Sequence, residues 1–135
     1  MSKKVKDYMT ANVVTVSETS ILSEAVDILN KGTFRHLPVL DNSGHVIGII
    51  SDRDLRNLQT AMAFIEEAVD GLKSEITLSD VMTGGVISVP SEMSLKEAAS
   101  LLIEKKFGAL PVVDAGKLTG ILSYTDVLRA YVDLT

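Results

Sequence analysis

Two short stretches of the chain place a hydroxyl and a carboxylate three residues apart, directly after a run of apolar residues. Ser123 and Asp126 form one pair, and Ser51 and Asp54 form the other. The apolar run predicts a strand that is covered on both faces, and Ser followed by Asp at this spacing indicates the start of a helix. Backbone N–H groups point outward at a helix start, so each junction is a candidate site for an anion.

The other residues that could do chemistry do not form a catalytic set. The two histidines, His36 and His45, fall on different predicted elements without a carboxylate at the spacing of metal ligands. The sequence has no cysteine, no Gly-x-Ser-x-Gly motif and no Walker-type glycine loop. Helix capping and solvation explain the paired carboxylates near residues 52 and 66 better than acid–base chemistry does. We therefore expect neither an enzyme nor a metal centre.

Both junctions lie inside two longer stretches that match each other. Met9 and Met82 lie 73 residues apart, and the same spacing relates Leu37 to Leu110. The spacing then falls to 72 residues, because the first copy has one extra residue in a glycine-bearing turn, where a change of length costs least. The chain is therefore an internal repeat, with expected domains at 1–56 and 78–135 and a helical connector at 57–77.

The same elements are predicted in each copy. Ser94 and Glu97 form a capping box that opens a helix of about ten residues, and the matching helix of the first copy stops near Gly32. A hairpin and a last helix follow in each copy. In chain order, the expected elements are extended pieces at Val13–Val16 and Val86–Val89, helices near Ile21 and Leu95, hairpins of Leu37–Leu40 with Val46–Ile50 and of Leu110–Val113 with Leu118–Leu122, and last helices from about Asp52 and Tyr124.

The connector carries apolar residues at helical spacing from Ala61 to Leu72. A helix packed over the join between the copies explains this stripe most simply, and contact with a second molecule is the alternative. Together with the apolar helix faces of both copies, the stripe leads us to expect a homodimer, because apolar patches of several hundred Å² are unusual on monomers.

The composition excludes several other classes of protein. The 135 residues carry 13 basic and 18 acidic side chains, for a net charge of −5, which argues against a general binder of nucleic-acid backbones. Hydrophobic residues make up 46% of the chain, enough for a core, while aromatic residues make up 4%. No apolar run has the length of a signal peptide or of a membrane helix. We expect a soluble, cytoplasmic protein without a membrane partner.

The two copies together resemble a tandem pair of CBS domains, named after cystathionine beta-synthase and also called a Bateman module. The resemblance rests on the segments Asp7–Thr10, Arg35–Val39 and Gly48–Leu55 of the first copy and on Asp80–Thr83, Gly108–Asp114 and Gly120–Val127 of the second. None of these motifs is specific alone, but their duplicated order is. The first copy is also similar to the CBS region of bacterial acetoin-utilisation proteins.

The resemblance implies an α/β fold of two β-α-β-β-α repeats related by a pseudo-twofold axis, with sheets packed face to face. It also implies two clefts between the repeats, each able to hold AMP, ADP or ATP, with no required cofactor. In this family, the Asp after the last strand of one repeat holds the ribose, and apolar and backbone groups of the other repeat hold the base.

Carried onto this sequence, the resemblance assigns ten residues to each cleft. One cleft contains Thr10, Val14, Thr15, Phe34, Arg35, His36, Pro38, Ser123, Thr125 and Asp126. The other contains Ser51, Arg53, Asp54, Thr83, Ile87, Ser88, Phe107, Gly108, Ala109 and Pro111.

Simpler structural roles remain open for several of these residues. Asp54 and Asp126 could be plain helix caps, although capping gives no reason for the Ser spacing to recur with them. The apolar members, namely Val14, Ile87, Phe34 and Phe107, suit a core as well as a cleft wall, and Thr15 and Ser88 could close turns.

The cations for a phosphate differ between the two clefts. Arg53 lies at the helix start beside Asp54, whereas Thr125 holds the matching position beside Asp126. The Asp126 cleft would therefore draw its positive charge from Arg35 and His36 of the other repeat.

We thus expect a regulatory module that senses an adenine nucleotide and signals to a regulated protein or to its own dimer. Two alternatives remain: an interaction scaffold with vestigial clefts, and a binder of S-adenosylmethionine or NAD on the same fold.

Overall fold

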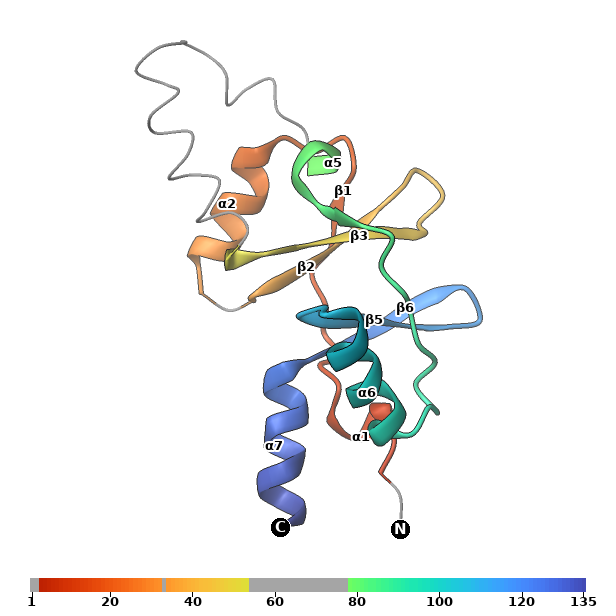
Figure 1. Cartoon of the computed structure of the whole chain (residues 1–135). Coiled ribbons are helices and arrows are strands. Elements are labelled where there is room, and N and C mark those ends of the chain that lie inside the picture. Colours follow the sequence, from red (N-terminus) through yellow and green to blue (C-terminus); the bar gives the residue numbers. More distant parts are fainter. Residues whose placement is uncertain (1–2, 33, 54–77) are drawn as a thin grey trace. The chain divides into compact units, whose positions relative to one another are not determined.

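The computed structural model describes residues 3–32, 34–53 and 78–135. It has the α/β fold that the sequence predicts (Figure 1). Its elements are α1 (Val5–Tyr8), β1 (Val16–Ser17), α2 (Leu22–Asn30), β2 (His36–Leu40), β3 (Val46–Ser51), α5 (Leu78–Val81), β4 (Thr83–Gly84), α6 (Leu95–Lys105), β5 (Ala109–Asp114), β6 (Lys117–Ser123) and α7 (Tyr124–Leu134). The expected connector helix at 57–77, with its apolar stripe, lies outside the described residues.

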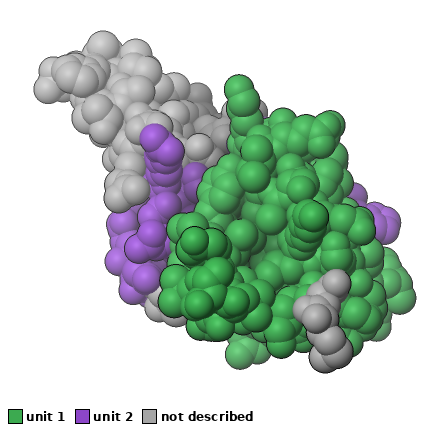
Figure 2. Space-filling model, turned by 60° about the horizontal axis from the view of Figure 1, so that its bottom comes forward, with its two compact units in different colours: residues 1–13, 86–135 green, residues 14–85 purple. Residues whose placement is uncertain are grey.

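The chain divides into two compact units. Unit 2 comprises residues 14–85, and unit 1 comprises residues 1–13 together with residues 86–135 (Figure 2). Compactness therefore groups the N-terminal segment with the second copy of the repeat, and it groups residues 78–85 with the first copy. The division by sequence repeat, at 1–56 and 78–135, describes the duplication and stays a prediction about domains.

Unit 2 contains a sheet with the strand order β1-β2-β3-β4. β1 runs parallel to β2, while the β2–β3 hairpin and the β3–β4 pair are antiparallel. β4 belongs by sequence to the second copy, and its Thr83 pairs with Ile49 of β3. Of the extended piece predicted at Val13–Val16, the last residue, Val16, pairs with β2 as part of β1.

Unit 1 repeats this arrangement around the β5–β6 hairpin. Val89 forms a parallel bridge with Val112 on one side, and Thr10 forms an antiparallel bridge with Ile121 on the other. These bridges match the pairs Val16–Val39 and Thr83–Ile49 of unit 2. The duplication seen in the sequence is therefore also a duplication of strand pairing.

Each unit has its own hydrophobic core, in which one helix packs against the sheet. In unit 2, the apolar face of α2 meets β2 and β3, and in unit 1 the apolar face of α6 meets β5 and β6 (Figure 1). The fully buried residues Val5 and Leu78 occupy matching places in the two cores. Each of them belongs by sequence to the copy in the other unit, so each core is completed by an exchanged segment.

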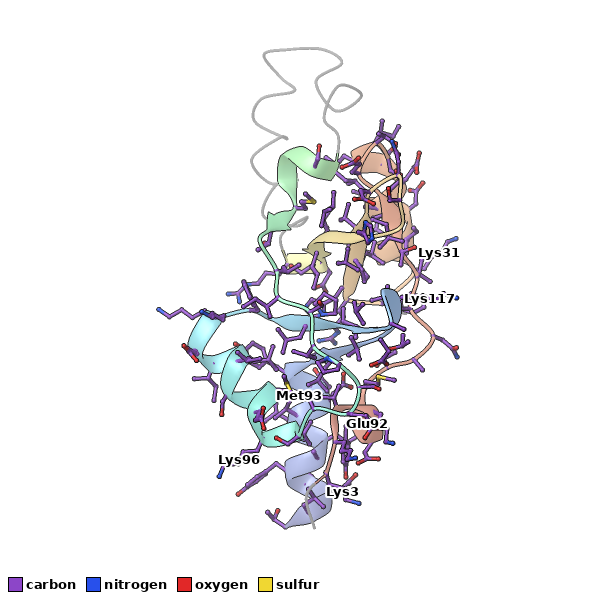
Figure 3. The ribbon with its side chains drawn as sticks, turned by 90° about the vertical axis from the view of Figure 1, so that its right-hand side faces the viewer. Lys3, Lys31, Glu92, Met93, Lys96 and Lys117 are labelled. Atoms are coloured by element: carbon purple, nitrogen blue, oxygen red, sulfur yellow. The ribbon has the colours of Figure 1, made fainter. Side chains whose placement is uncertain are left out.

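The helix ends follow the predicted signals in part, because α6 has one of the two contacts of the predicted Ser94–Glu97 capping box. The Ser94 hydroxyl accepts a hydrogen bond from the Glu97 N–H at 3.1 Å, so the Ser94 contact of the predicted capping box is present at the start of α6. Gly32 follows α2 with a φ of +75°, a conformation that glycine adopts without strain. The Lys96 side chain on the first turn of α6 extends into solvent (Figure 3).

The two hairpins differ in their turns. Asp41 in the longer turn accepts hydrogen bonds from the N–H groups of Ser43 and His45. In the shorter turn, Ala115 and Gly116 join Asp114 directly to Lys117, and both have a positive φ. That pair of dihedrals is typical of a type I′ turn, which needs one residue fewer.

Candidate functional site

Three hydrogen bonds join Ser123 and Asp126 at the start of α7. The Asp126 Oδ2 atom accepts the Ser123 backbone N–H at 2.9 Å and the Ser123 hydroxyl at 3.2 Å. In return, the Asp126 N–H donates to the Ser123 hydroxyl oxygen at 3.4 Å. The capping role considered for Asp126 is therefore real, and it leaves Oδ1 outside the cap.

The Oδ1 atom of Asp126 has a different partner, Arg129. The Arg129 Nη1 atom lies 3.2 Å away, on the next turn of α7. Asp126 is 3% exposed, and charged side chains are rarely so buried without a partner. Arg129 was not among the expected site residues. Its spacing of three residues from Asp126 on a predicted helix was the signal that could have found it.

Backbone segments of unit 1 surround this junction. Ala109 pairs with Ser123 across the hairpin, and the Tyr124 N–H donates to the Gly108 carbonyl at 3.3 Å. On the opposite edge of β6, Thr10 and Ile121 exchange two backbone hydrogen bonds, each 2.9 Å long. Gly108 therefore lies beside the start of α7, and Thr10 lies along the other edge of β6, at Ile121.

Two glycines permit the close approach of the exchanged segments. A Cβ atom built on Gly120 would lie 2.8 Å from the Thr10 carbonyl oxygen, and one built on Gly48 would lie 2.9 Å from the Thr83 carbonyl oxygen. Both distances are shorter than real Cβ contacts. The glycine before each apolar run is thus required by the segment that crosses it.

The corresponding end of β3 in unit 2 has the same frame. His36 pairs with Ser51, and the Asp52 N–H donates to the Arg35 carbonyl at 2.9 Å. Asp52 and Arg53 begin a helix there, and the Arg53 side chain is exposed. Asp54, the expected ribose ligand, lies outside the described residues.

Members of each predicted cleft fall in both units. In unit 1, the structure brings Thr10, Ser123, Thr125 and Asp126 of the first predicted cleft to one end of β6. The remaining members of that cleft, Val14, Thr15, Phe34, Arg35, His36 and Pro38, are in unit 2.

The second predicted cleft is divided in the same way. Ser51, Arg53 and Thr83 are in unit 2, and Ile87, Ser88, Phe107, Gly108, Ala109 and Pro111 are in unit 1. The pairing across units stays a prediction for both clefts.

The predicted members of the clefts differ in burial. Pro38, Ala109 and Pro111 are buried, while Thr10, Arg35, Ser88, Gly108 and Thr125 are exposed. Phe34 and Phe107 are half-buried and pack against the cores of their own units, and Ile87 is 37% exposed. Both phenylalanines therefore contribute to a hydrophobic core, which is the structural role that the sequence left open for them.

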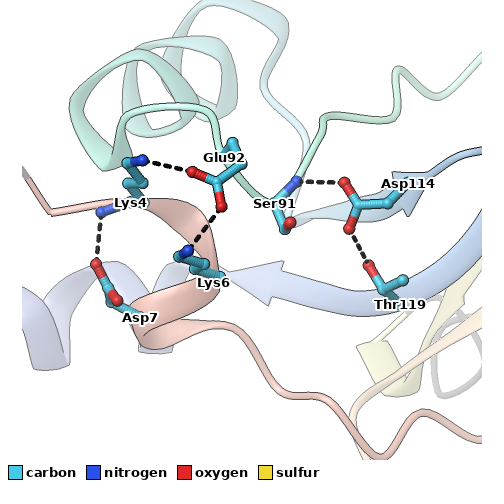
Figure 4. A network of polar contacts seen from close by, with 7 residues as sticks. All are labelled: Lys4, Lys6, Asp7, Ser91, Glu92, Asp114 and Thr119. Carbon is cyan, nitrogen blue, oxygen red and sulfur yellow. Dashed lines mark hydrogen bonds and ion pairs between the residues drawn. The ribbon is translucent and has the colours of Figure 1, made fainter.

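A polar network holds the N-terminal segment and the loop before α6 in place (Figure 4). Glu92 accepts charged hydrogen bonds from Lys4 and Lys6, and the contact with Lys4 comes first among the causes that lower the pKa of Glu92. Asp114 accepts the Ser91 N–H and the Thr119 hydroxyl, each at 2.9 Å. These hydrogen bonds, chiefly those with Ser91, lower the pKa of Asp114 below its usual value.

The described residues also bear on metal binding and on membrane crossing. Within residues 3–32, 34–53 and 78–135, His, Asp and Glu side chains do not gather in groups of three or more that could bind a metal ion. None of the helices in these ranges combines the length and the apolar character that a membrane crossing requires.

Comparison with known proteins places these features in a family. The model of the CBS domain matches residues 5–60 and again residues 78–133. The crystal structure of CBSX2 in complex with AMP, a protein of Arabidopsis thaliana, is 33% identical, covers 98% of both chains and superposes with a TM-score of 0.76.

Two other solved structures extend the comparison. A protein from Vibrio cholerae that is named AcuB, after acetoin utilisation, is 31% identical over 99% of this chain and 93% of its own, with a TM-score of 0.76. The CBS domain pair of protein MJ0100, in complex with 5-methylthioadenosine and S-adenosyl-L-methionine, is 25% identical over the whole of both chains, with a TM-score of 0.81. The family resemblance expected from the sequence is thereby confirmed: this chain belongs to the CBS domain family and carries two CBS domains in tandem.

Proposed function

We propose that this chain is a regulatory module that binds an adenine nucleotide, namely AMP, ADP or ATP, through its two CBS domains. The carrying observation is the Ser123–Asp126 junction, where a buried carboxylate and a hydroxyl lie together at the end of β6, the strand whose Ile121 pairs with the exposed Thr10. A carboxylate can accept ribose hydroxyls, and a hydroxyl beside a helix start suits a phosphate. The CBSX2 structure with AMP supports this choice of ligand.

The two predicted clefts define the ligand sites of this proposal. Asp126 and Asp54 would each hold a ribose, and Arg53 would meet a phosphate in the site that contains Asp54. Bound ligand would change how the module contacts a regulated protein or a second copy of itself. The chain would act by binding and not by catalysis.

S-adenosylmethionine is the second candidate ligand. It shares the adenosine moiety but carries a positive sulfonium and no phosphate. The specific support is the likeness to the MJ0100 pair, which was solved with S-adenosyl-L-methionine and 5-methylthioadenosine. The two candidates differ in the charge that the site must meet, so they can be separated by titration.

Calorimetric titration with AMP, ADP, ATP, NADH and S-adenosylmethionine tests the proposal. We expect heat from at least one adenine nucleotide, with up to two sites per chain. Asp54→Ala and Asp126→Ala should each remove one site, while Asp27→Ala, on the exposed face of α2, should remove none. Absence of heat from every ligand would favour an interaction scaffold, and unchanged stoichiometry in both site variants would refute the assigned residues.

A further inference from the structure

Arg129 and Asp126 form an ion pair whose two members differ in their access to solvent. The carboxylate side chain is 5% exposed, whereas the guanidinium side chain is 57% exposed. Asp126 is fixed by the cap of α7, while Arg129 reaches it from the outside of the helix. The arginine can therefore leave the pair without opening the core of unit 1.

The hydrogen bonds of Asp126 determine which oxygen is left for a ligand. Both donors of Ser123 go to Oδ2, so Oδ1 is the oxygen on which a further hydroxyl can be accepted. Arg129 already donates to Oδ1. Because a carboxylate oxygen accepts about two hydrogen bonds, one ligand hydroxyl fits beside Arg129, and two require Arg129 to move away.

A ligand phosphate can replace the Asp126 carboxylate as the hydrogen-bond acceptor of Arg129. The guanidinium keeps its charge and its five donors, and phosphate accepts them in forked, charge-assisted bonds. A neutral nucleoside that places two hydroxyls on Oδ1 has no such group, so it would break the ion pair without replacing it. The geometry thus favours a phosphorylated ligand over the nucleoside at this junction.

We propose that Arg129 makes the Asp126 site selective for phosphorylated nucleosides, pairing with Asp126 in the free protein and with a ligand phosphate in the complex. This inference rests on the proposed nucleotide-binding function. Arg129 would add a cation from α7 itself to the Arg35 and His36 that the sequence assigns to this site. The first copy has Asn57 at the position that matches Arg129, so we assign this selectivity to the Asp126 site and not to the Asp54 site.

The test compares AMP with adenosine in Arg129→Gln. Both ligands are titrated calorimetrically against a protein that also carries Asp54→Ala, so that the Asp126 site is the one measured. We expect the affinity for AMP to fall about tenfold or more, as for the loss of a charged hydrogen bond. The affinity for adenosine should stay the same or rise. Arg129→Lys, which keeps the charge, should recover part of the preference for AMP.

The outcomes separate this inference from the function on which it rests. Equal fold losses for AMP and adenosine in Arg129→Gln, which leave the ratio of the two affinities unchanged, would mean that Arg129 only supports the helix. That result would overturn the role of Arg129 but not the nucleotide-binding function. If the Asp54→Ala parent and the wild-type protein bind neither ligand, both the nucleotide-binding function and the role of Arg129 are refuted.

Discussion

At Gly120 and Gly48, the identity of a single residue decides whether an exchanged segment can reach its strand. Each glycine underlies a Met-Thr pair that belongs to the other copy of the repeat. The sequence shows these glycines as part of a repeated motif, but it gives no distance to the crossing segment. The reason for glycine becomes visible only when the two parts of the chain are in contact.

Gly120→Ala should destabilise the protein by about 1–3 kcal/mol, the usual cost of forcing extra volume into a packed site. The new Cβ would meet the Thr10 carbonyl at 2.8 Å, and backbone cannot move aside as a flexible side chain can. Urea denaturation measures the effect. Gly84→Ala is the matched control, because its Cβ would have no atom within 4 Å. Equal stability of the two variants would contradict the packing argument.

Ala115 is a residue whose backbone conformation does not suit its side chain. Its φ is +51°, a region where an alanine costs about 1 kcal/mol and where asparagine is well tolerated. Ala115→Asn should therefore raise the free energy of unfolding by up to that amount. The opposite sign is expected for Gly116→Ala, at a φ of +77°. Thermal or urea denaturation of both variants checks the pair, and a loss in both would argue against a type I′ turn.

At the junction itself, the sequence predicted the cap but not the ion pair. Ser123 and Asp126 follow a spacing that local rules recognise, because all three of their hydrogen bonds form within one helical turn. Arg129 obeys an equally local rule, but a pattern of charges at this spacing is common on exposed helices and does not single out one pair. The burial of Asp126 gives the pair its significance, and burial depends on the whole unit.

Among the elements, the exchanged segments carry the anchors that complete each core. Val5 and Leu78 are fully buried, and their backbone N–H groups donate to the Met93 and Ser20 carbonyls. The two hairpins and the starts of α2, α6 and α7 were predicted to within a residue or two because their contacts are close in sequence, whereas the short helices α1 and α5 were not predicted. The exchange could not be predicted in this way, since Thr10 pairs with Ile121 and Thr83 with Ile49 across long stretches of chain.

Leu78→Ala should cost about 2–5 kcal/mol of stability, as expected for a fully buried leucine replaced by alanine. The loss would fall on unit 2, whose core contains Leu78 although the residue follows the connector in sequence. Hydrogen exchange can locate it, through faster exchange in β2 and β3. Leu134→Ala is the control, because this leucine is 55% exposed at the end of α7. A comparable loss in the control would show that the effect is not due to burial.

The polar network before α6 should make the stability of the protein depend on acid. Hydrogen bonds from Ser91 and Thr119 lower the pKa of Asp114 from its ordinary value of 3.8. A carboxylate with a lowered pKa contributes stability that is complete above the unfolded pKa and is lost as the pH falls through the folded one. The contribution of Asp114 should therefore be lost below about pH 4.

Asp114→Asn isolates this contribution, because the amide keeps an acceptor for Ser91 but does not titrate. We expect the wild type to lose more stability than the variant between about pH 5 and pH 3, so that their free energies of unfolding converge in acid. Asp27→Asn makes the same change of charge on the exposed face of α2. Parallel pH profiles for wild type and Asp114→Asn would remove Asp114 from the acid response.

At the scale of the whole molecule, the duplicated motifs identified the family. The family in turn predicted two nucleotide-binding clefts, which no single motif could predict. Each unit repeats one pattern of strand pairing, so the second copy serves as an internal check on the first. The two copies nevertheless differ at the positions that would contact a phosphate. Arg53 of the first copy aligns with Thr125 of the second, and Asn57 aligns with Arg129. We therefore expect two related sites with unequal preferences.

The last expectation is that two copies of the chain associate. α7 carries Tyr124, Leu128, Tyr131 and Val132 at helical spacing, each between 45% and 71% exposed, and Ile103 of α6 is 73% exposed. We propose that the exposed apolar face of α7 contributes to a homodimer, because large apolar surfaces are rarely left uncovered on monomers. Light scattering at micromolar concentration should give the mass of a dimer.

The variant Leu128→Lys should convert the dimer to a monomer while leaving the free energy of unfolding of each chain nearly unchanged, since the side chain is 64% exposed. A charge buried in an apolar interface has no partner and costs several kcal/mol, which is comparable to the stability of a modest dimer. Ile21→Lys provides the control, because Ile21 is an exposed apolar residue of unit 2 that lies outside α6 and α7. A wild-type protein that scatters as a monomer would refute the dimer. A dimer that survives Leu128→Lys but not Ile21→Lys would place the interface on unit 2 instead.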